Sequence, residues 1–111
     1  VRAAQAREAL RQRLISLADS MRQQTIALWG ANVRMMDCIE ILADAGAILH
    51  GDGRLIAVDR NPAIWGTYIK NPDALTPKHV GHVIICATAF ETEIRMELAK
   101  LGFQPEQVSC V

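Results

Sequence analysis

The residues best suited to hold a ligand stand where short apolar runs of the sequence end. The run at positions 25–29 ends at Gly30, and a helical spacing of apolar residues begins soon after it, close to Arg34. A later run, at positions 54–58, ends in Asp59. A carboxylate there can accept both hydroxyls of a ribose, while the free N–H groups of a helix start, together with Arg34, can neutralise a phosphate. Asp is also an ordinary residue where a strand passes into a turn, so both interpretations of Asp59 stay open.

These positions belong to one predicted crevice. Where chains leave two neighbouring parallel strands in opposite directions, a crevice opens at the carboxyl ends of the strands, and ligands bind there in this class of sheet. A nucleotide or an NAD-type ligand is the cofactor class that we consider for it, and the sequence does not identify which. The candidate ligand-binding residues are Gly30, Ala31, Asn32, Arg34, Asp59, Arg60 and Thr88.

The dinucleotide fingerprint Gly-x-Gly-x-x-Gly is incomplete in this chain. Only Gly30 is kept, because Asn32 and Met35 occupy the places of the second and third glycines. Side chains at those places keep the backbone away from a pyrophosphate and keep the helix away from the strand. We therefore do not expect a tightly held dinucleotide across this turn, although a more distant phosphate remains compatible with the pattern.

No catalytic set and no metal site is predicted. The histidines lie in turns or at the start of a strand, where surface or packing roles are usual, and the serines have no nucleophile-elbow surroundings. The cysteines lie far apart without a zinc-ligand spacing, so we expect buried, reduced thiols. These residues are His50, His79, His82, Ser16, Ser20, Ser109, Cys38, Cys86 and Cys110.

The elements that must position the crevice follow from hydrophobic periodicity. Apolar runs predict strands at 25–29, 54–59, 82–87 and 107–111, and helical spacing predicts a helix over 33–45 that ends at Gly46. Thr88 and Glu91 have capping-box spacing, which predicts a second helix from that point with Phe90, Ile94, Leu98 and Leu101 on its inner face. Gly102 should end this helix, and Phe103 should pack back on its last turn.

This alternation predicts an α/β fold with a short parallel Rossmann-like sheet of about four strands and flanking helices. The expected strand order is second, first, third, fourth, which places the topological switch between the first and third strands. A parallel sheet covered on both faces has no wet side, so its apolar residues should be mostly buried. Those that we expect in the core are Ile26, Leu28, Ile56, Val58, Val83 and Ile85.

An amphipathic helix at the N-terminus precedes the sheet. We predict two units, this helix at 1–22 and the Rossmann-like domain at 23–111. The apolar stripe of the helix allows two interpretations, which stay open: it packs on the domain's own sheet, or it forms the seam of a homodimer. The stripe consists of Leu10, Leu14, Leu17 and Met21.

Charge and length narrow the class of protein. Twelve Lys and Arg residues balance twelve Asp and Glu residues in the 111-residue chain, so a nucleic-acid partner or a polybasic membrane anchor is not expected. No apolar run approaches the roughly 20 residues of a membrane span, and no signal-peptide block begins the chain. We expect a soluble, cytoplasmic domain with no membrane partner.

Several of these motifs also carry a family resemblance. The helix from Leu14, the run Ile-Ala-Leu-Trp-Gly-Ala at 26–31, Val-Asp-Arg-Asn-Pro at 58–62 and Gly-Thr-Tyr at 66–68 resemble the small Rossmann-like C-terminal domain of sugar C-methyltransferases. They are also similar to the N-terminal nucleotide-sugar-binding domain of bacterial sugar O-acyltransferases. The resemblance implies a setting in nucleotide-sugar or surface-polysaccharide biosynthesis. It carries Gly30, Ala31, Asn32 and Asp59 over as ligand-side positions.

Two positions depart from the methyltransferase pattern. Trp29 replaces the usual Tyr or Phe before the Gly-Ala turn, and the residues after that turn, 32–34, lack the expected lysine. Methyl transfer itself would belong to another domain, so whether the chain acts as an enzyme is left undecided.

Three functions are compatible with these patterns. The leading one is a module that binds a nucleotide or nucleotide sugar within a larger enzyme of sugar or surface-polysaccharide biosynthesis. The alternative is a structural or oligomerisation module with a vestigial crevice. A free-standing dehydrogenase or epimerase is disfavoured by the lost glycines and by the lack of a Tyr-x-x-x-Lys pair.

Overall fold

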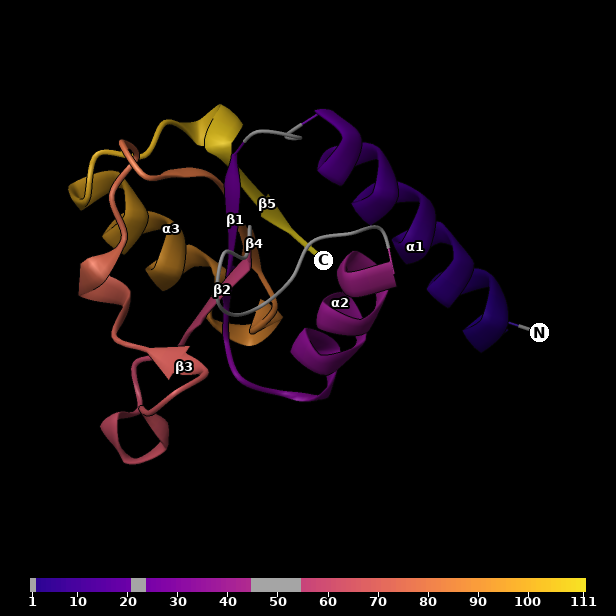
Figure 1. Ribbon diagram of the computed structural model, residues 1–111, viewed down its shortest axis with the longest axis horizontal. Coiled ribbons are helices and arrows are strands. Elements are labelled where there is room, and N and C mark those ends of the chain that lie inside the picture. Colours follow the sequence, from indigo (N-terminus) through magenta and orange to yellow (C-terminus); the bar gives the residue numbers. More distant parts are fainter. Residues whose placement is uncertain (1, 21–23, 45–54) are drawn as a thin grey trace.

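Five parallel strands form one sheet between two layers of helices in the computed structural model, which describes residues 2–20, 24–44 and 55–111 (Figure 1). Helices α1 and α2 cover one face of the sheet and α3 covers the other. The helices are α1 (Arg2–Ser20), α2 (Val33–Asp44) and α3 (Glu91–Lys100). The strands are β1 (Thr25–Trp29), β2 (Leu55–Val58), β3 (Ile69–Lys70), β4 (Val80–Ile85) and β5 (Val108–Cys110).

The strand order is β3-β2-β1-β4-β5. This confirms the α/β class and the expected order of the four main strands, and β3 adds a two-residue edge strand beside β2. At the centre, Trp29 of β1 lies in register with Val58 of β2 on one side and with Ile85 of β4 on the other. The topological switch therefore lies between β1 and β4, as predicted.

The sheet is buried on both faces, as the continuous apolar runs of its strands require. Of the six residues predicted in the core, Ile56 alone is half-buried and the others are buried. One core cluster joins α1 and α2 to residues such as Ile26 and Leu28. The second joins α3 to residues such as Val83 and Ile85.

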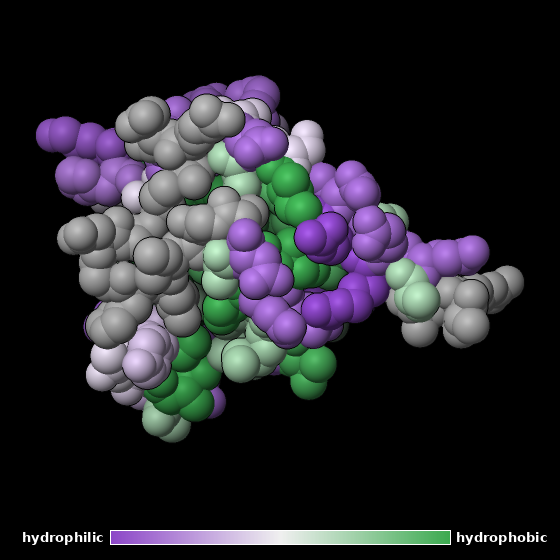
Figure 2. All heavy atoms as spheres, turned by 45° about the vertical axis from the view of Figure 1, so that its right-hand side comes forward, coloured by the Kyte–Doolittle hydropathy of each residue, from purple (hydrophilic) through white to green (hydrophobic). Residues whose placement is uncertain are grey.

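Helix α1 packs its apolar stripe against the sheet of its own domain. Leu14 is 1% exposed and Ala18 2%, and both belong to the core cluster that includes Ile26, while Leu10 and Leu17 are partly buried against it. Met21, the last member of the predicted stripe, lies outside the described residues. Figure 2 shows hydrophilic residues along the outer side of α1. None of the helices in the described part of the chain is long and apolar enough to cross a membrane.

The start of α3 differs from the prediction. A single 3-10 turn, Thr88–Phe90, precedes the helix, and no side chain at the cap positions of either element makes a capping hydrogen bond. The predicted capping box is therefore wrong, since Glu91 instead bonds Arg95 one turn later at 2.7 Å. Because the turn rotates it away from the sheet, Phe90 is 62% exposed and does not belong to the inner face of the helix.

The predicted end of α3 is confirmed. Gly102 ends α3 with a φ of +101°, and the Phe103 N–H donates to the Leu98 carbonyl at 3.0 Å with the Phe103 side chain buried. The Asn61 and Asn71 side chains each cap a short 3-10 turn that begins with a proline. The predicted end of α2 at Gly46 lies outside the described residues.

Candidate ligand crevice

The chain leaves β1 toward α2 and leaves β4 toward α3, and a crevice of about 560 Å³ lies between these exits. This volume falls within the usual range for small-molecule sites. Five of the predicted residues line the crevice. These are Gly30, Ala31, Asn32, Asp59 and Arg60.

Gly30 is required by packing between the two strand exits. Its φ of +114° lies in the left-handed region, and a Cβ at this position would stand 2.6 Å from the Cβ of Ala87 and 2.7 Å from its backbone nitrogen. Only a glycine fits both conditions. The Gly30 N–H also donates to the carbonyl of Val58 at 3.0 Å, so this turn is held by β2 as well as by the exit of β4.

Asp59 holds the two turns that frame the crevice. One carboxylate oxygen accepts a hydrogen bond from the backbone N–H of Ala31, and the other accepts one from the N–H of Asn61, both at 2.8 Å. The Ala31 N–H, a potential phosphate donor, is thereby already engaged. Each carboxylate oxygen can accept more than one hydrogen bond, so Asp59 retains capacity for a ligand hydroxyl.

Asn32 connects the start of α2 to the end of β4. Its side-chain oxygen accepts from the Met35 N–H at 2.9 Å, which caps the helix, and its side-chain amide donates to the carbonyl of Cys86 at 3.1 Å. An amide oxygen that satisfies a free N–H of the first helical turn stabilises the helix start. A side chain with two hydrogen bonds thus occupies the position where the dinucleotide fingerprint would place its second glycine.

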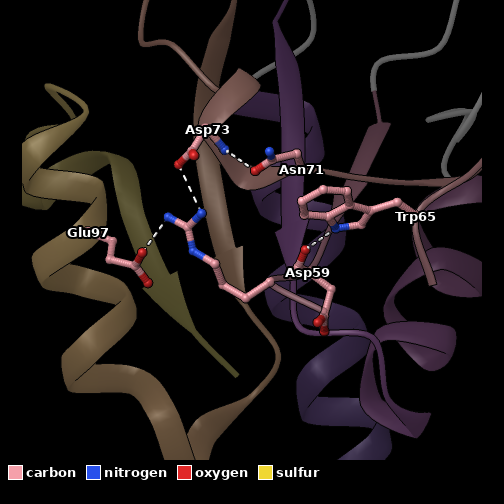
Figure 3. Close-up of polar contacts among 6 residues, drawn as sticks. Asp59, Trp65, Asn71, Asp73 and Glu97 are labelled. Carbon is pink, nitrogen blue, oxygen red and sulfur yellow. Dashed lines mark hydrogen bonds and ion pairs between the residues drawn. The ribbon is translucent and has the colours of Figure 1, made fainter. Parts of the chain in front are cut away.

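Arg60 is engaged with carboxylates rather than free for a phosphate. Its guanidinium lies 2.9 Å from Asp73 and also pairs with Glu97 of α3 (Figure 3). The same guanidinium stands 5.6 Å from the ring centroid of Trp29, which is buried beneath it. The hydrogen bond to Glu97 is the main cause that raises the pKa of Arg60; burial opposes it, and the hydrogen bond to Asp73 adds to the increase. Arg60 therefore acts as a bridge between the β2 exit and α3.

The loop after β2 is fixed by a further contact at the same edge. The indole N–H of Trp65 donates to the backbone carbonyl of Asp59 at 2.6 Å, and Figure 3 shows the indole lying over that carbonyl. The Asn71 side chain accepts from the N–H of Asp73 at 2.9 Å, which positions the acid that pairs with Arg60. These two contacts hold the carbonyl of Asp59 and the Asp73 partner of Arg60 in place.

Arg34 and Thr88, the other two predicted residues, line a separate hollow. This second groove, of about 600 Å³, lies between α1 and the start of α2 and shares Asn32 with the crevice. Arg7 of α1 also lines it and pairs with Asp37 of α2 at 3.0 Å. The seven predicted residues are therefore gathered at one edge of the sheet but divided between two hollows.

The crevice carries more acid than base. Asp59, Glu93 and Glu97 line it against the single cation Arg60. This excess disfavours a phosphate inside the crevice, because like charges repel most strongly where water is limited. The prediction from sequence missed Glu93 and Glu97 as lining residues, although their spacing of four places them on one face of a helix. It also missed the exposed ring of Phe90, which lines the same crevice.

The cysteines and histidines do not line the crevice in the described part of the chain. Among the described residues, no group of three or more His, Cys, Asp or Glu side chains is arranged to hold a metal ion. Cys38 and Cys86 are buried free thiols, as predicted, and Cys110 is half-buried. His79 is exposed, His82 is buried, and His50 lies outside the described residues.

In comparisons with protein-family models, with curated proteins and with solved structures, nothing matches this chain.

Proposed function

We propose that this chain is a small-molecule-binding module that recognises a nucleotide or a nucleotide sugar at the carboxyl edge of its sheet. On this proposal it serves a larger enzyme of sugar or surface-polysaccharide biosynthesis. The observation that carries the proposal is the position of Asp59, whose carboxylate lines an open crevice at the topological switch, next to the Gly30 turn. Ribose hydroxyls are ligand groups that a carboxylate binds at the corresponding place in sheets of this class.

The charges of the two hollows suggest how the ligand lies. The crevice is acidic, so it suits the uncharged ribose and base, and the exposed ring of Phe90 offers a stacking surface. The second groove contains Arg34, whose charge suits a phosphate. Asn32 lines both hollows. A nucleotide with its ribose near Asp59 and its phosphate near Arg34 would therefore lie over Asn32.

The structural alternative is favoured by the internal contacts of the same residues. Asp59 already holds two backbone N–H groups, and Arg60 already bridges Asp73 and Glu97. These contacts give each residue a stabilising role without a ligand. On this alternative the crevice is vestigial and the chain is a structural or oligomerisation module.

Ligand binding separates the two functions. Isothermal titration calorimetry with nucleosides, nucleotides and nucleotide sugars should detect binding to the parent chain. Asp59→Asn should weaken it by the value of one or two charge-assisted hydrogen bonds, about 1.5 to 3 kcal/mol each. Asp44→Asn changes an exposed acid at the end of α2 and should leave binding unchanged. Absence of binding at millimolar concentrations to the folded parent would replace the module proposal with the structural one.

Arg34 provides a second, independent test. Arg34→Ala should weaken the binding of phosphorylated ligands more than that of nucleosides, and added salt should reduce the difference because screening weakens the ion pair. Arg11→Ala removes an exposed cation of α1 that lines neither hollow and serves as the matched control. Equal losses for nucleosides and nucleotides would contradict the assignment of the phosphate to the second groove.

A further inference from the structure

A histidine and a serine from neighbouring strands meet on the α1 side of the sheet. The Nε2 atom of His82 on β4 lies 2.7 Å from the Oγ atom of Ser109 on β5. His82 is 4% exposed, and among the described residues it is the one polar side chain that is buried. A serine within hydrogen-bond reach of an imidazole is the basic arrangement of an activated nucleophile.

Ser109 opens onto a groove that is distinct from the candidate ligand site. This groove, of about 600 Å³, runs between α1 and the strands β4 and β5, and it shares no lining residue with the crevice or the second groove. Leu14 and Ile84 give it apolar walls, while Arg13 and Ser16 of α1 line it with polar groups. An apolar acyl chain and a polar ester group can both be accommodated in such a space.

The second ring nitrogen of His82 has no hydrogen-bond partner in the part of the chain that the structure describes. Nδ1 is fully buried and unpaired among the described residues. A buried polar atom without a partner lowers stability, and an apolar residue in its place would avoid that cost. Packing therefore does not explain a histidine at this position, whereas the contact between its Nε2 and the hydroxyl of Ser109 gives the ring a polar partner.

The state of the imidazole suits a proton acceptor. Burial lowers the pKa of His82, so the ring is neutral at physiological pH. The contact between Nε2 and Oγ has two possible directions. With the proton on Nε2 the ring donates to the Ser109 oxygen; with the proton on Nδ1 the lone pair of Nε2 accepts from the Ser109 hydroxyl, and base catalysis requires this second tautomer. No carboxylate of the described ranges 2–20, 24–44 and 55–111 pairs with Nδ1, so none of them supplies a counter-charge for the imidazolium that forms on proton transfer.

We propose that Ser109 is a nucleophile, activated by His82, and that small acyl esters bound in the groove acylate it. Oγ attacks the carbonyl carbon of the ester while its proton moves to Nε2 of His82. The bond between the carbonyl carbon and the alkoxide oxygen then breaks, and the alkoxide takes the proton from Nε2 and leaves as an alcohol. The products are an acyl ester on Ser109 and a free alcohol, with His82 again neutral.

The weak base sets the rate of this chemistry. An imidazole with a lowered pKa accepts a proton less readily, and the imidazolium at His82 is buried without a partner. We therefore expect one acylation per chain and slow release of the acyl group, so that the modified serine accumulates. This makes the site observable by mass spectrometry of the intact chain.

The test uses 4-nitrophenyl acetate as the acyl donor and peptide mapping to locate the acetyl group. Ser109 should be acetylated faster than Ser16 and Ser20, which line the same groove without a histidine partner. Ser109→Ala should abolish the fast reaction. His82→Gln keeps a polar atom near the Nε2 position but cannot act as the base, and it should slow acetylation of Ser109 by on the order of a hundredfold.

The pH profile of the parent chain gives a readout that does not need a variant. With His82 as the base, the rate of acetylation should reach a plateau once the imidazole is neutral. A rate that instead rises tenfold per pH unit through the neutral range would belong to an unassisted hydroxyl and would overturn the proposal. Acetylation of Ser109 no faster than that of Ser16, or an unchanged rate in a folded His82→Gln variant, would overturn it as well.

Discussion

The carboxylate of Asp59 accepts the backbone N–H of Ala31 at 2.8 Å, and this bond ties the end of β2 to the turn that follows β1. A second bond of the same length, from the N–H of Asn61, holds the loop on the other side of the acid. The residue with the strongest claim to bind a ligand is thus also a structural link between two strand exits. The binding role and the structural role of Asp59 can be separated by experiment, because Asp59→Asn removes the charge and keeps one oxygen that can accept a backbone N–H.

Substitution of Asp59 should affect stability as well as binding. Asp59→Ala removes two hydrogen bonds to the backbone N–H groups of exposed residues and should lower the free energy of unfolding by about 1 to 3 kcal/mol in total. Asp59→Asn keeps one acceptor oxygen and should lower it less. Urea denaturation followed by circular dichroism measures both. Equal stability of Asp59→Ala and the parent would show that these two bonds contribute little.

Gly30 and Gly66 form a matched pair for testing the turn after β1. Gly30→Ala forces a side chain into a left-handed conformation and onto the backbone of Ala87, so it should lower the free energy of unfolding by about 2 to 5 kcal/mol. Gly66→Ala places its Cβ in open space and should change the free energy by less than about 1 kcal/mol. Thermal denaturation of the two variants checks the difference, and a small effect at Gly30 would contradict the close contact.

Much of the architecture was predictable because it depends on local patterns. Buried parallel strands appear as continuous apolar runs, so β1, β2 and β4 could be placed from the sequence, and their order was predicted correctly. The end of α3 was equally predictable, since a glycine followed by a hydrophobic residue is a common pattern where a helix ends. These features need no information about distant contacts.

The site was less predictable because its residues are joined by contacts distant in sequence. The partner of Arg60 on α3 and the bond between Asp59 and Ala31 depend on how the elements pack, which spacing alone does not specify. Phe90 shows the same limit. Thr88 and Glu91 match a capping box in sequence, but the chain forms a 3-10 turn there and directs the ring of Phe90 to solvent.

Leu14 tests where the apolar stripe of α1 is buried. Leu14→Ala should lower the free energy of unfolding by about 2 to 5 kcal/mol, because this side chain is 1% exposed and fills the core of its own domain. Arg11→Ala, on the exposed side of the same helix, should change it by less than about 0.5 kcal/mol. Sedimentation of the parent over a range of concentrations completes the test. A dimeric parent that becomes a folded monomer in Leu14→Asp would instead assign the stripe to self-association.

His82 should make the stability of the domain depend on pH. Burial lowers its pKa in the folded chain below the ordinary value of 6.5, so the unfolded chain binds more protons as pH falls through that value. The free energy of unfolding should therefore be unaffected by His82 above about pH 7.5 and decrease toward pH 5.5, by at most about 1.4 kcal/mol per pH unit.

Denaturation curves of the parent and of His82→Gln isolate this contribution, since the other titrating groups are common to both. The decrease should be smaller in His82→Gln and unchanged in His79→Gln, which alters an exposed histidine. The same dependence in His82→Gln and the parent would mean that the buried ring of His82 is not the group responsible.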